Sequence, residues 1–165
     1  MAQLNRRRPQ NVSGDFYVDS TCIDCDTCRW MAPTVFHQAD EQSAIYHQPV
    51  TQTERLAAMQ ALLSCPTASI GTVEKPQDIK EVHNSFPIPV AENVFHCGYH
   101  AEDSYAAASY FIVRPEGNVL VDSPRFAAPL VKRLEAMGSI RYMYLTHRDD
   151  INYSGLPSGW SLSFQ

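Results

Sequence analysis

The sequence predicts an α+β fold in two parts. Short β-prone runs alternate with two segments of helical periodicity. Four of the five cysteines lie in the first half of the chain. Prolines gather between the halves, and the residue pattern changes on either side of them. We expect a first domain at residues 13–75, a linker at 76–89, a second segment at 90–150 and an atypical tail at 151–165.

Composition narrows the function classes. The chain has 165 residues, of which 44% are hydrophobic and 19% charged, so it can bury a packed core. Its formal net charge of -5 argues against a general nucleic-acid binder. No apolar run approaches the ~18 residues of a membrane span. The arginines at residues 6–8 are interpreted as a short basic tail, because no apolar stretch follows them to make a secretory signal. We therefore expect a cytoplasmic protein.

Three short strands are expected in the first half. Residues 16–18 are β-prone and lead into the cysteine-rich segment. Residues 44–46 form a second β-prone run. Residues 72–74 are expected to form the closing strand.

A helix is expected over residues 51–64. Thr51 and Glu54 have the spacing of a capping box, in which each side chain binds the other residue's backbone N–H. Apolar residues at spacings of three and four predict one buried face. This face is expected to contain Leu56, Met59 and Leu63.

The cysteines carry the strongest chemical indication. Cys22, Cys25 and Cys28 follow the pattern C-x2-C-x2-C, and Cys65 directly precedes Pro66. An iron–sulfur cluster offers several iron corners, each of which takes one thiolate. A chain winding around it presents a sulfur at every third residue, while a remote cysteine closes the far side. The spacing therefore favours an iron–sulfur cluster.

Two other interpretations of the cysteines compete with an iron–sulfur cluster. A structural zinc site usually uses two separated C-x2-C pairs, and the second pair is missing. Disulfides are disfavoured by the expected reducing compartment and by the odd number of cysteines. Zinc remains the main alternative.

The motif resembles that of bacterial-type ferredoxins, in which C-x2-C-x2-C-x3-C-P occurs twice. In the first copy, Ala32 replaces the fourth cysteine but Pro33 remains. In the second copy, Cys65 remains, while the other three positions hold Arg55, Ala58 and Ala61. All four missing cysteines would bind one of the two clusters, and all four ligands of the other cluster are present. The chain therefore resembles a single-cluster [4Fe-4S] ferredoxin domain. The resemblance implies one cluster, with the ligands Cys22, Cys25, Cys28 and Cys65.

Such a cluster has no open coordination position, which predicts a one-electron carrier. Residues 15–74 contain eight acidic residues against two arginines. Negative surroundings disfavour the uptake of an electron, so we expect a low potential. The same charge predicts a redox partner protein with a basic docking patch. Trp30 and Met31 are candidates for shielding the cluster, although core packing is the plainer interpretation.

The second half is expected to contain a hairpin, a helix and further strands. The strands are expected at residues 94–95, 109–113, 119–121 and 140–145, the hairpin turn at 115–118 and the helix at 129–137.

Two motifs in this half resemble the start of a metallo-β-lactamase-like fold. They are LVDSP at residues 120–124 and LTH at residues 145–147. The resemblance implies a metal-binding H-x-H-x-D-H motif, in which His147 matches the first histidine and Asp149 stands at the second. Ile151 and Asn152 replace the remaining ligands, and the tail offers no strong substitute. We therefore do not expect a second metal. The second half is expected to be either a truncated domain or a segment with a binding role.

Other polar and cysteine residues of this half are expected to have structural roles. His96 and His100 are interpreted as surface or core residues rather than metal ligands, and Cys97 as a small buried hydrophobe. Asp122 is expected to have a polar structural role. We expect electron transfer rather than hydrolysis. The alternatives are a redox-linked metallohydrolase with metal at His147 and Asp149, and a binding module with a structural cluster.

Overall fold

The computed structural model describes residues 1–147. The chain divides into two compact units, Met1–Val82 and a second that begins at His83. Among the described residues, no helix has both the length and the apolar character needed to cross a membrane. Each unit has its own sheets and core.

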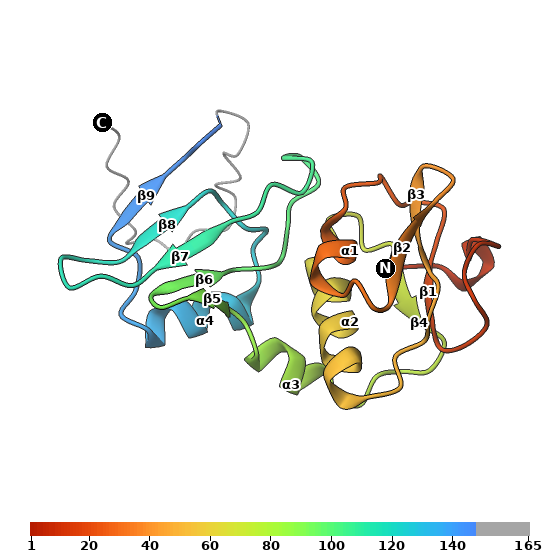
Figure 1. Cartoon of the computed structure of the whole chain (residues 1–165). Helices are drawn as coiled ribbons and strands as arrows, with labels where there is room; N and C mark the ends of the chain where they lie inside the picture. Colours follow the sequence, from red (N-terminus) through yellow and green to blue (C-terminus); the bar gives the residue numbers. More distant parts are fainter. Residues whose placement is uncertain (148–165) are drawn as a thin grey trace. The chain divides into compact units, whose positions relative to one another are not determined.

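The first unit combines short strands with two main helices (Figure 1). Strand β1 pairs antiparallel with β4, and β2 pairs antiparallel with β3. Its elements are the 3-10 turn η1 (Leu4–Arg6), β1 (Phe16–Val18), α1 (Thr27–Met31), β2 (Phe36–Ala39), β3 (Gln42–Ile45), α2 (Gln52–Ser64) and β4 (Ile70–Thr72). Helix α3 (Ile79–Asn84) spans the boundary between the units, within the expected linker.

The strand expected at residues 16–18 is confirmed as β1. The closing strand lies at Ile70–Thr72 rather than at 72–74, because Val18 of β1 pairs with Ile70. Strand β3 begins at Gln42, two residues earlier than expected, and ends at Ile45. Its partner β2 was not expected from the sequence.

The expected capping box at the start of α2 is confirmed. Thr51 Oγ1 accepts from the Glu54 N–H at 3.2 Å, and Glu54 Oε2 accepts from the Thr51 N–H at 3.0 Å. The two side chains therefore satisfy two of the backbone donors that a helix start leaves without an intrahelical partner.

The expected apolar face of α2 is wrong in part. Met59 is fully buried, but Leu56 is 40% exposed and Leu63 is half-buried. The buried face instead carries Ala58, Met59, Ala61 and Ser64. Three of these four residues are small, and small side chains let a neighbouring element such as α1 approach closely.

The second unit contains one five-stranded sheet in the order β5-β6-β7-β8-β9. All pairs are antiparallel except β8 and β9, which are parallel. A parallel pair needs a crossover, and α4 provides it. The elements are β5 (Ile88–Ala91), β6 (Val94–His96), β7 (Tyr110–Ile112), β8 (Val119–Val121), α4 (Ala128–Ala136) and β9 (Tyr142–Tyr144). Leu130 and Leu134 of α4 are buried, as are Phe111 and Leu120 of the sheet.

The expected hairpin and helix of the second half are confirmed as β7–β8 and α4. Asn118 holds the hairpin turn to the end of the helix. Its Oδ1 accepts from the Arg114 N–H at 3.1 Å, and its Nδ2 donates to the carbonyl oxygens of Met137 and Ser139 at 3.1 and 2.9 Å. The final strand is shorter than the expected residues 140–145.

Candidate metal centre

Four cysteines line one cavity in the first unit: Cys22, Cys25, Cys28 and Cys65. The first two lie in the loop between β1 and α1, and Cys28 lies on α1. Cys65 is the C-cap residue of α2. All five cysteines of the chain are free thiols. The fold thus brings a remote cysteine to the cysteine-rich loop, as the spacing predicts.

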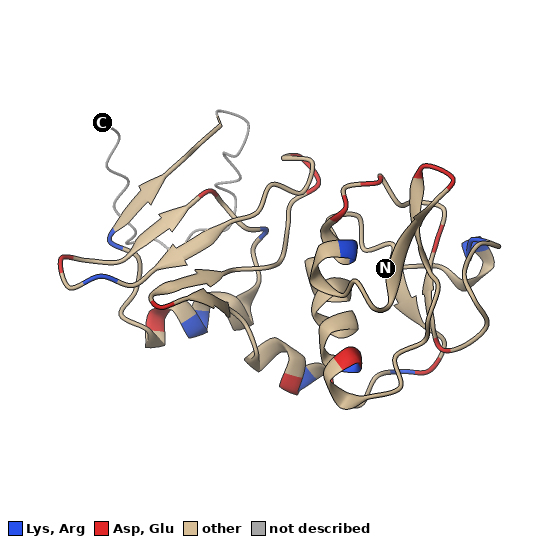
Figure 2. Ribbon diagram, viewed as in Figure 1, with Lys and Arg blue, Asp and Glu red and all other residues tan. Residues whose placement is uncertain are grey.

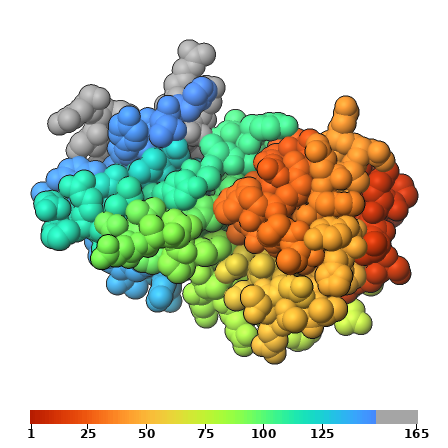
Figure 3. Space-filling view, in the orientation of Figure 1, coloured from red at the N-terminus to blue at the C-terminus, as the bar shows by residue number. Residues whose placement is uncertain are grey.

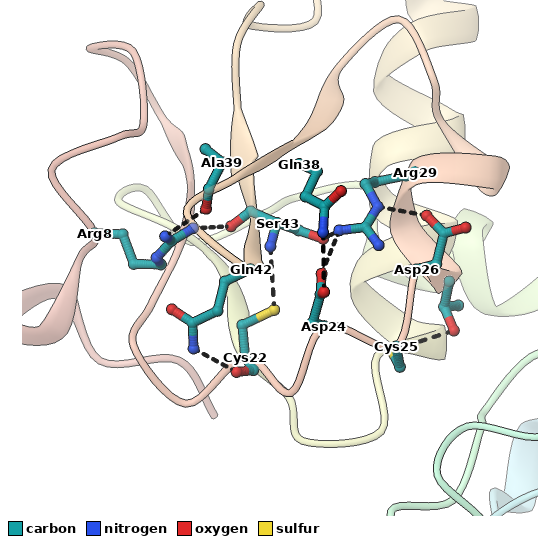
Figure 4. A network of polar contacts seen from close by, with 11 residues as sticks. Arg8, Cys22, Asp24, Cys25, Asp26, Arg29, Gln38, Ala39, Gln42 and Ser43 are labelled. Carbon is teal, nitrogen blue, oxygen red and sulfur yellow. Dashed lines mark hydrogen bonds and ion pairs between the residues drawn. The ribbon is translucent and has the colours of Figure 1, made fainter.

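The loop between the first ligands owes its shape to two aspartates. Asp24 and Asp26 have φ angles of 58° and 67°, in the left-handed region that Asp tolerates better than most residues. Arg29 forms ion pairs with both, and its Nη1 lies 2.5 Å from Asp24 Oδ1 (Figure 4). Burial lowers the pKa of Arg29, but the hydrogen bonds to Asp24 and Asp26 outweigh it and raise the pKa. Arg29 therefore stays charged and holds the loop.

Hydrogen bonds involve all four sulfurs, and that of Cys28 comes from the Ser43 side chain. The backbone N–H of Ser43 donates to Cys22 Sγ at 3.5 Å, and that of Ser69 donates to Cys65 Sγ at 3.3 Å. Cys25 Sγ lies 3.5 Å from Thr27 Oγ1. The two N–H donors at Cys22 and Cys65 stabilise negative charge on their sulfurs, and bonds of this kind tune the potential of iron–sulfur centres.

Burial disfavours thiolates at this site. It raises the pKa of Cys28 to about 12, against an opposing hydrogen bond from the Ser43 side chain. Burial likewise raises the pKa of Cys65, against hydrogen bonds from Ser69 and Thr67. Coordination to a metal deprotonates a thiol outright. The cavity is therefore suited to thiolates only when a cationic metal group is bound.

The donor set fits a cluster better than a single ion. Zinc draws its ligands to one point, with Zn–S distances of about 2.3 Å. Within residues 1–147, no group of three or more His, Cys, Asp or Glu side chains is arranged to hold a metal ion. The four cysteines instead surround a cavity, which suits a group with several iron corners.

Comparison with known families agrees. Residues 18–72 match the family model described as the 4Fe-4S single cluster domain of Ferredoxin I. The match lies within the first unit and includes all four cavity cysteines. No curated protein and no solved structure matches the chain. The comparisons give no support to the expected metallo-β-lactamase-like segment.

Within the first unit, the positions that would correspond to a second ferredoxin cluster are filled by packing. Ala32, Ala58 and Ala61 are at most 1% exposed. Arg55 turns instead to Asp78, with its Nε 2.6 Å from Asp78 Oδ2 and its Nη2 3.0 Å from Oδ1. The contact between α1 and α2 thus occupies this side of the first unit.

The acidic residues of the first unit are partly neutralised. Asp24 and Asp26 share Arg29, and Asp15 lies 3.9 Å from Arg55. The low potential expected from the charge count stays a prediction. Trp30 is 48% exposed, so the expectation that it is a core residue is wrong.

Two residues that border the site were missed in the sequence. Ser43, in β3, is 1% exposed and bonds to cysteines of the cavity. Arg8 is only 6% exposed, so it does not belong to a solvated basic tail. Neither residue lies in a motif, and no local pattern distinguishes Arg8 from its neighbours Arg6 and Arg7.

The candidates of the second unit do not form a described metal site. His147 is exposed, and Asp149 lies outside the described residues. Cys97 is fully buried, as expected. The structural role of Asp122 is also confirmed. Its Oδ1 accepts from the Thr146 N–H and its Oδ2 from the Thr146 hydroxyl, both at 2.7 Å.

Proposed function

We propose that residues 13–75 bind one [4Fe-4S] cluster through Cys22, Cys25, Cys28 and Cys65, and that the protein is a one-electron carrier. The observation that carries the proposal is the meeting of these cysteines around one cavity, although Cys65 is remote in sequence. The family match over residues 18–72 supports the type of cluster.

The bound cluster would supply the uptake and release of single electrons. Four thiolates fill its iron corners, which leaves no position for a substrate. The contribution of the chain is to hold the sulfurs, to direct N–H donors at Cys22 and Cys65, and to limit contact with water by burying Cys28 and Cys65. Electron transfer therefore fits the site better than hydrolysis.

A basic patch on a redox protein is the proposed partner surface. Asp26, Asp40 and Glu41 are exposed, near the first ligands and at the β2–β3 turn. Figure 2 shows acidic positions along the loop before α1 and at the tip of the β2–β3 hairpin. These two segments share one visible face of the first unit in the space-filling view (Figure 3). Opposite charge would steer a partner to this face.

The test of the cofactor is metal analysis of protein purified without oxygen. Iron, sulfide and zinc are measured on the same sample, and an EPR spectrum is recorded after reduction with dithionite. We expect about four irons and four sulfides per chain, with a signal from the reduced state. One zinc per chain without sulfide would contradict the proposal.

The test of the partner surface is the rate of electron transfer to a small basic cytochrome. We expect the rate to fall as ionic strength rises, because salt screens exposed charges. Asp40→Asn with Glu41→Gln should weaken this dependence, whereas Glu74→Gln serves as an acidic control outside the two segments. A salt dependence identical in all three proteins would argue against this docking face.

A further inference from the structure

Ser43 bonds to two of the four proposed ligands. Its backbone N–H donates to Cys22 Sγ at 3.5 Å, and its side chain hydrogen-bonds to Cys28. The residue lies in β3 opposite Gln38, and it is 1% exposed. Figure 4 shows Ser43 between the Cys22 sulfur and the two arginines Arg8 and Arg29.

Arg8 is a buried cation on the carbonyl side of Ser43. Its Nη1 donates to Ser43 O at 2.6 Å, and its Nη2 donates to Ala39 O at 2.8 Å. Among residues 1–147 Arg8 forms no ion pair with a carboxylate. A buried charge is costly unless an opposite charge lies near it. An anionic group in the neighbouring cavity would provide that compensation.

Arg29 acts on the side chain of Ser43. Its Nη1 donates to Ser43 Oγ at 3.2 Å and to Asp24 Oδ1 at 2.5 Å. A hydroxyl that accepts a bond from a guanidinium keeps its own proton available for another partner. The Ser43 hydroxyl is thereby directed to donate to Cys28, and the cation strengthens it as a donor.

We infer that Ser43, held between Arg8 and Arg29, raises the reduction potential of the cluster. This inference rests on the proposed function. A cluster held by four thiolates is an anion, and its negative charge grows by one when it is reduced. Hydrogen bonds to its sulfurs and nearby positive charges therefore stabilise the reduced state more than the oxidised state. Ser43 and the two arginines do not react themselves; they place hydrogen-bond donors and positive charge beside the cluster.

The redox step involves one electron and no other change. An external one-electron donor is oxidised, the cluster gains the electron, and a redox partner then takes it. No bond to Ser43 forms or breaks, and no proton is transferred. The network thus acts on the equilibrium of the step rather than on its chemistry.

The experiment is an anaerobic redox titration of the full-length holoprotein, followed by EPR. Ser43→Ala removes the hydroxyl but keeps the backbone donor, and Arg8→Met removes the buried charge. We expect both to shift the potential to more negative values. Arg8→Lys keeps the charge, so its shift should be smaller than that of Arg8→Met. This variant and Ser43→Ala keep the test available if Arg8→Met does not fold.

Two matched controls separate this role from packing. Ser64→Ala removes another buried hydroxyl, which has no hydrogen-bond partner among the described residues. Arg7→Met removes the adjacent arginine, whose guanidinium donates to Val12 and Gly14 carbonyls instead. Both should keep the wild-type potential, although either can lower the unfolding temperature.

Iron and sulfide content, measured on each sample, distinguishes a failure of the proposed role of Ser43 from a failure of the proposed electron-carrier function. If Ser43→Ala and Arg8→Met hold a full cluster at the wild-type potential, the role of Ser43 is overturned while the electron carrier stands. A wild-type protein with no iron–sulfur cluster would overturn the proposed function and, with it, this inference.

Discussion

The Nε2 atoms of His96 and His100 lie 2.8 Å apart, and each residue is 1% exposed. Their rings are nearly perpendicular, with an interplanar angle of 87°. At this distance one nitrogen donates and the other accepts, so the two facing nitrogens share one hydrogen. The sequence left surface and core positions open for these two residues, and the structure places both in the core, where the chain after β6 brings His100 back to His96.

This pair predicts acid sensitivity of the second unit. Burial lowers the pKa of both histidines to about 4. The charge of His100 also lowers the pKa of His96, and the charge of Arg125 lowers that of His100. The unfolded chain, with histidine pKa values near ~6.5, then binds more protons than the folded chain as pH falls. Stability is full above that value and declines below it. We expect the unfolding temperature to fall between pH 7.5 and 5, measured by circular dichroism.

A double variant, His96→Gln with His100→Gln, should flatten this pH dependence. The exposed His37→Gln serves as the control and should keep it. If the control and the double variant show the same slope as the wild type, the pair is not the source of the acid sensitivity.

Substitutions can distinguish the proposed cluster ligands from the fifth cysteine, Cys97. Cys25→Ser should lose most of the bound iron and sulfide, because it removes a thiolate from the cavity. Cys97→Ser should retain both, since Cys97 lies buried in the second unit. The measurement is iron and sulfide per folded chain. Retention of a full cluster by Cys25→Ser would exclude Cys25 as a required ligand.

Larger side chains at the contact between α1 and α2 should lower the stability of the protein. Ala58→Leu places extra atoms in a fully buried position and should cost about 1–3 kcal/mol of unfolding free energy. Ala57→Leu, at a half-buried neighbour, should cost less. Denaturant unfolding of both variants checks this, and equal losses would show that the position is not closely packed.

The start of α2 depends on its capping box. Thr51→Ala removes the acceptor for the Glu54 N–H and should destabilise the protein by about 0.5–2 kcal/mol. Thr53→Ala, at an exposed position two residues later, should change stability little. Thermal unfolding compares the two variants. A Thr53→Ala loss as large as that of Thr51→Ala would indicate helix propensity rather than capping.

The parts of this molecule that follow from local rules were predictable. The cysteine spacing predicted that a remote cysteine joins the cysteine-rich loop, and Thr51 with Glu54 predicted the start of α2. Helix α1 has five residues and β2 has four, which is too short for a periodic pattern to form. Helix α3 was hidden because the prolines around it favour a linker interpretation.

The sequence by itself determined the chemistry that short spacing controls: a cysteine-rich loop with a remote fourth cysteine, and a capped helix between them. Only the tertiary structure decided which face of α2 is buried, because that depends on the size of the gap left by α1. It also decided that Arg8 and Ser43 meet beside Cys22, although they are far apart along the chain. Such contacts depend on chain packing in three dimensions, and no local pattern of residues encodes them.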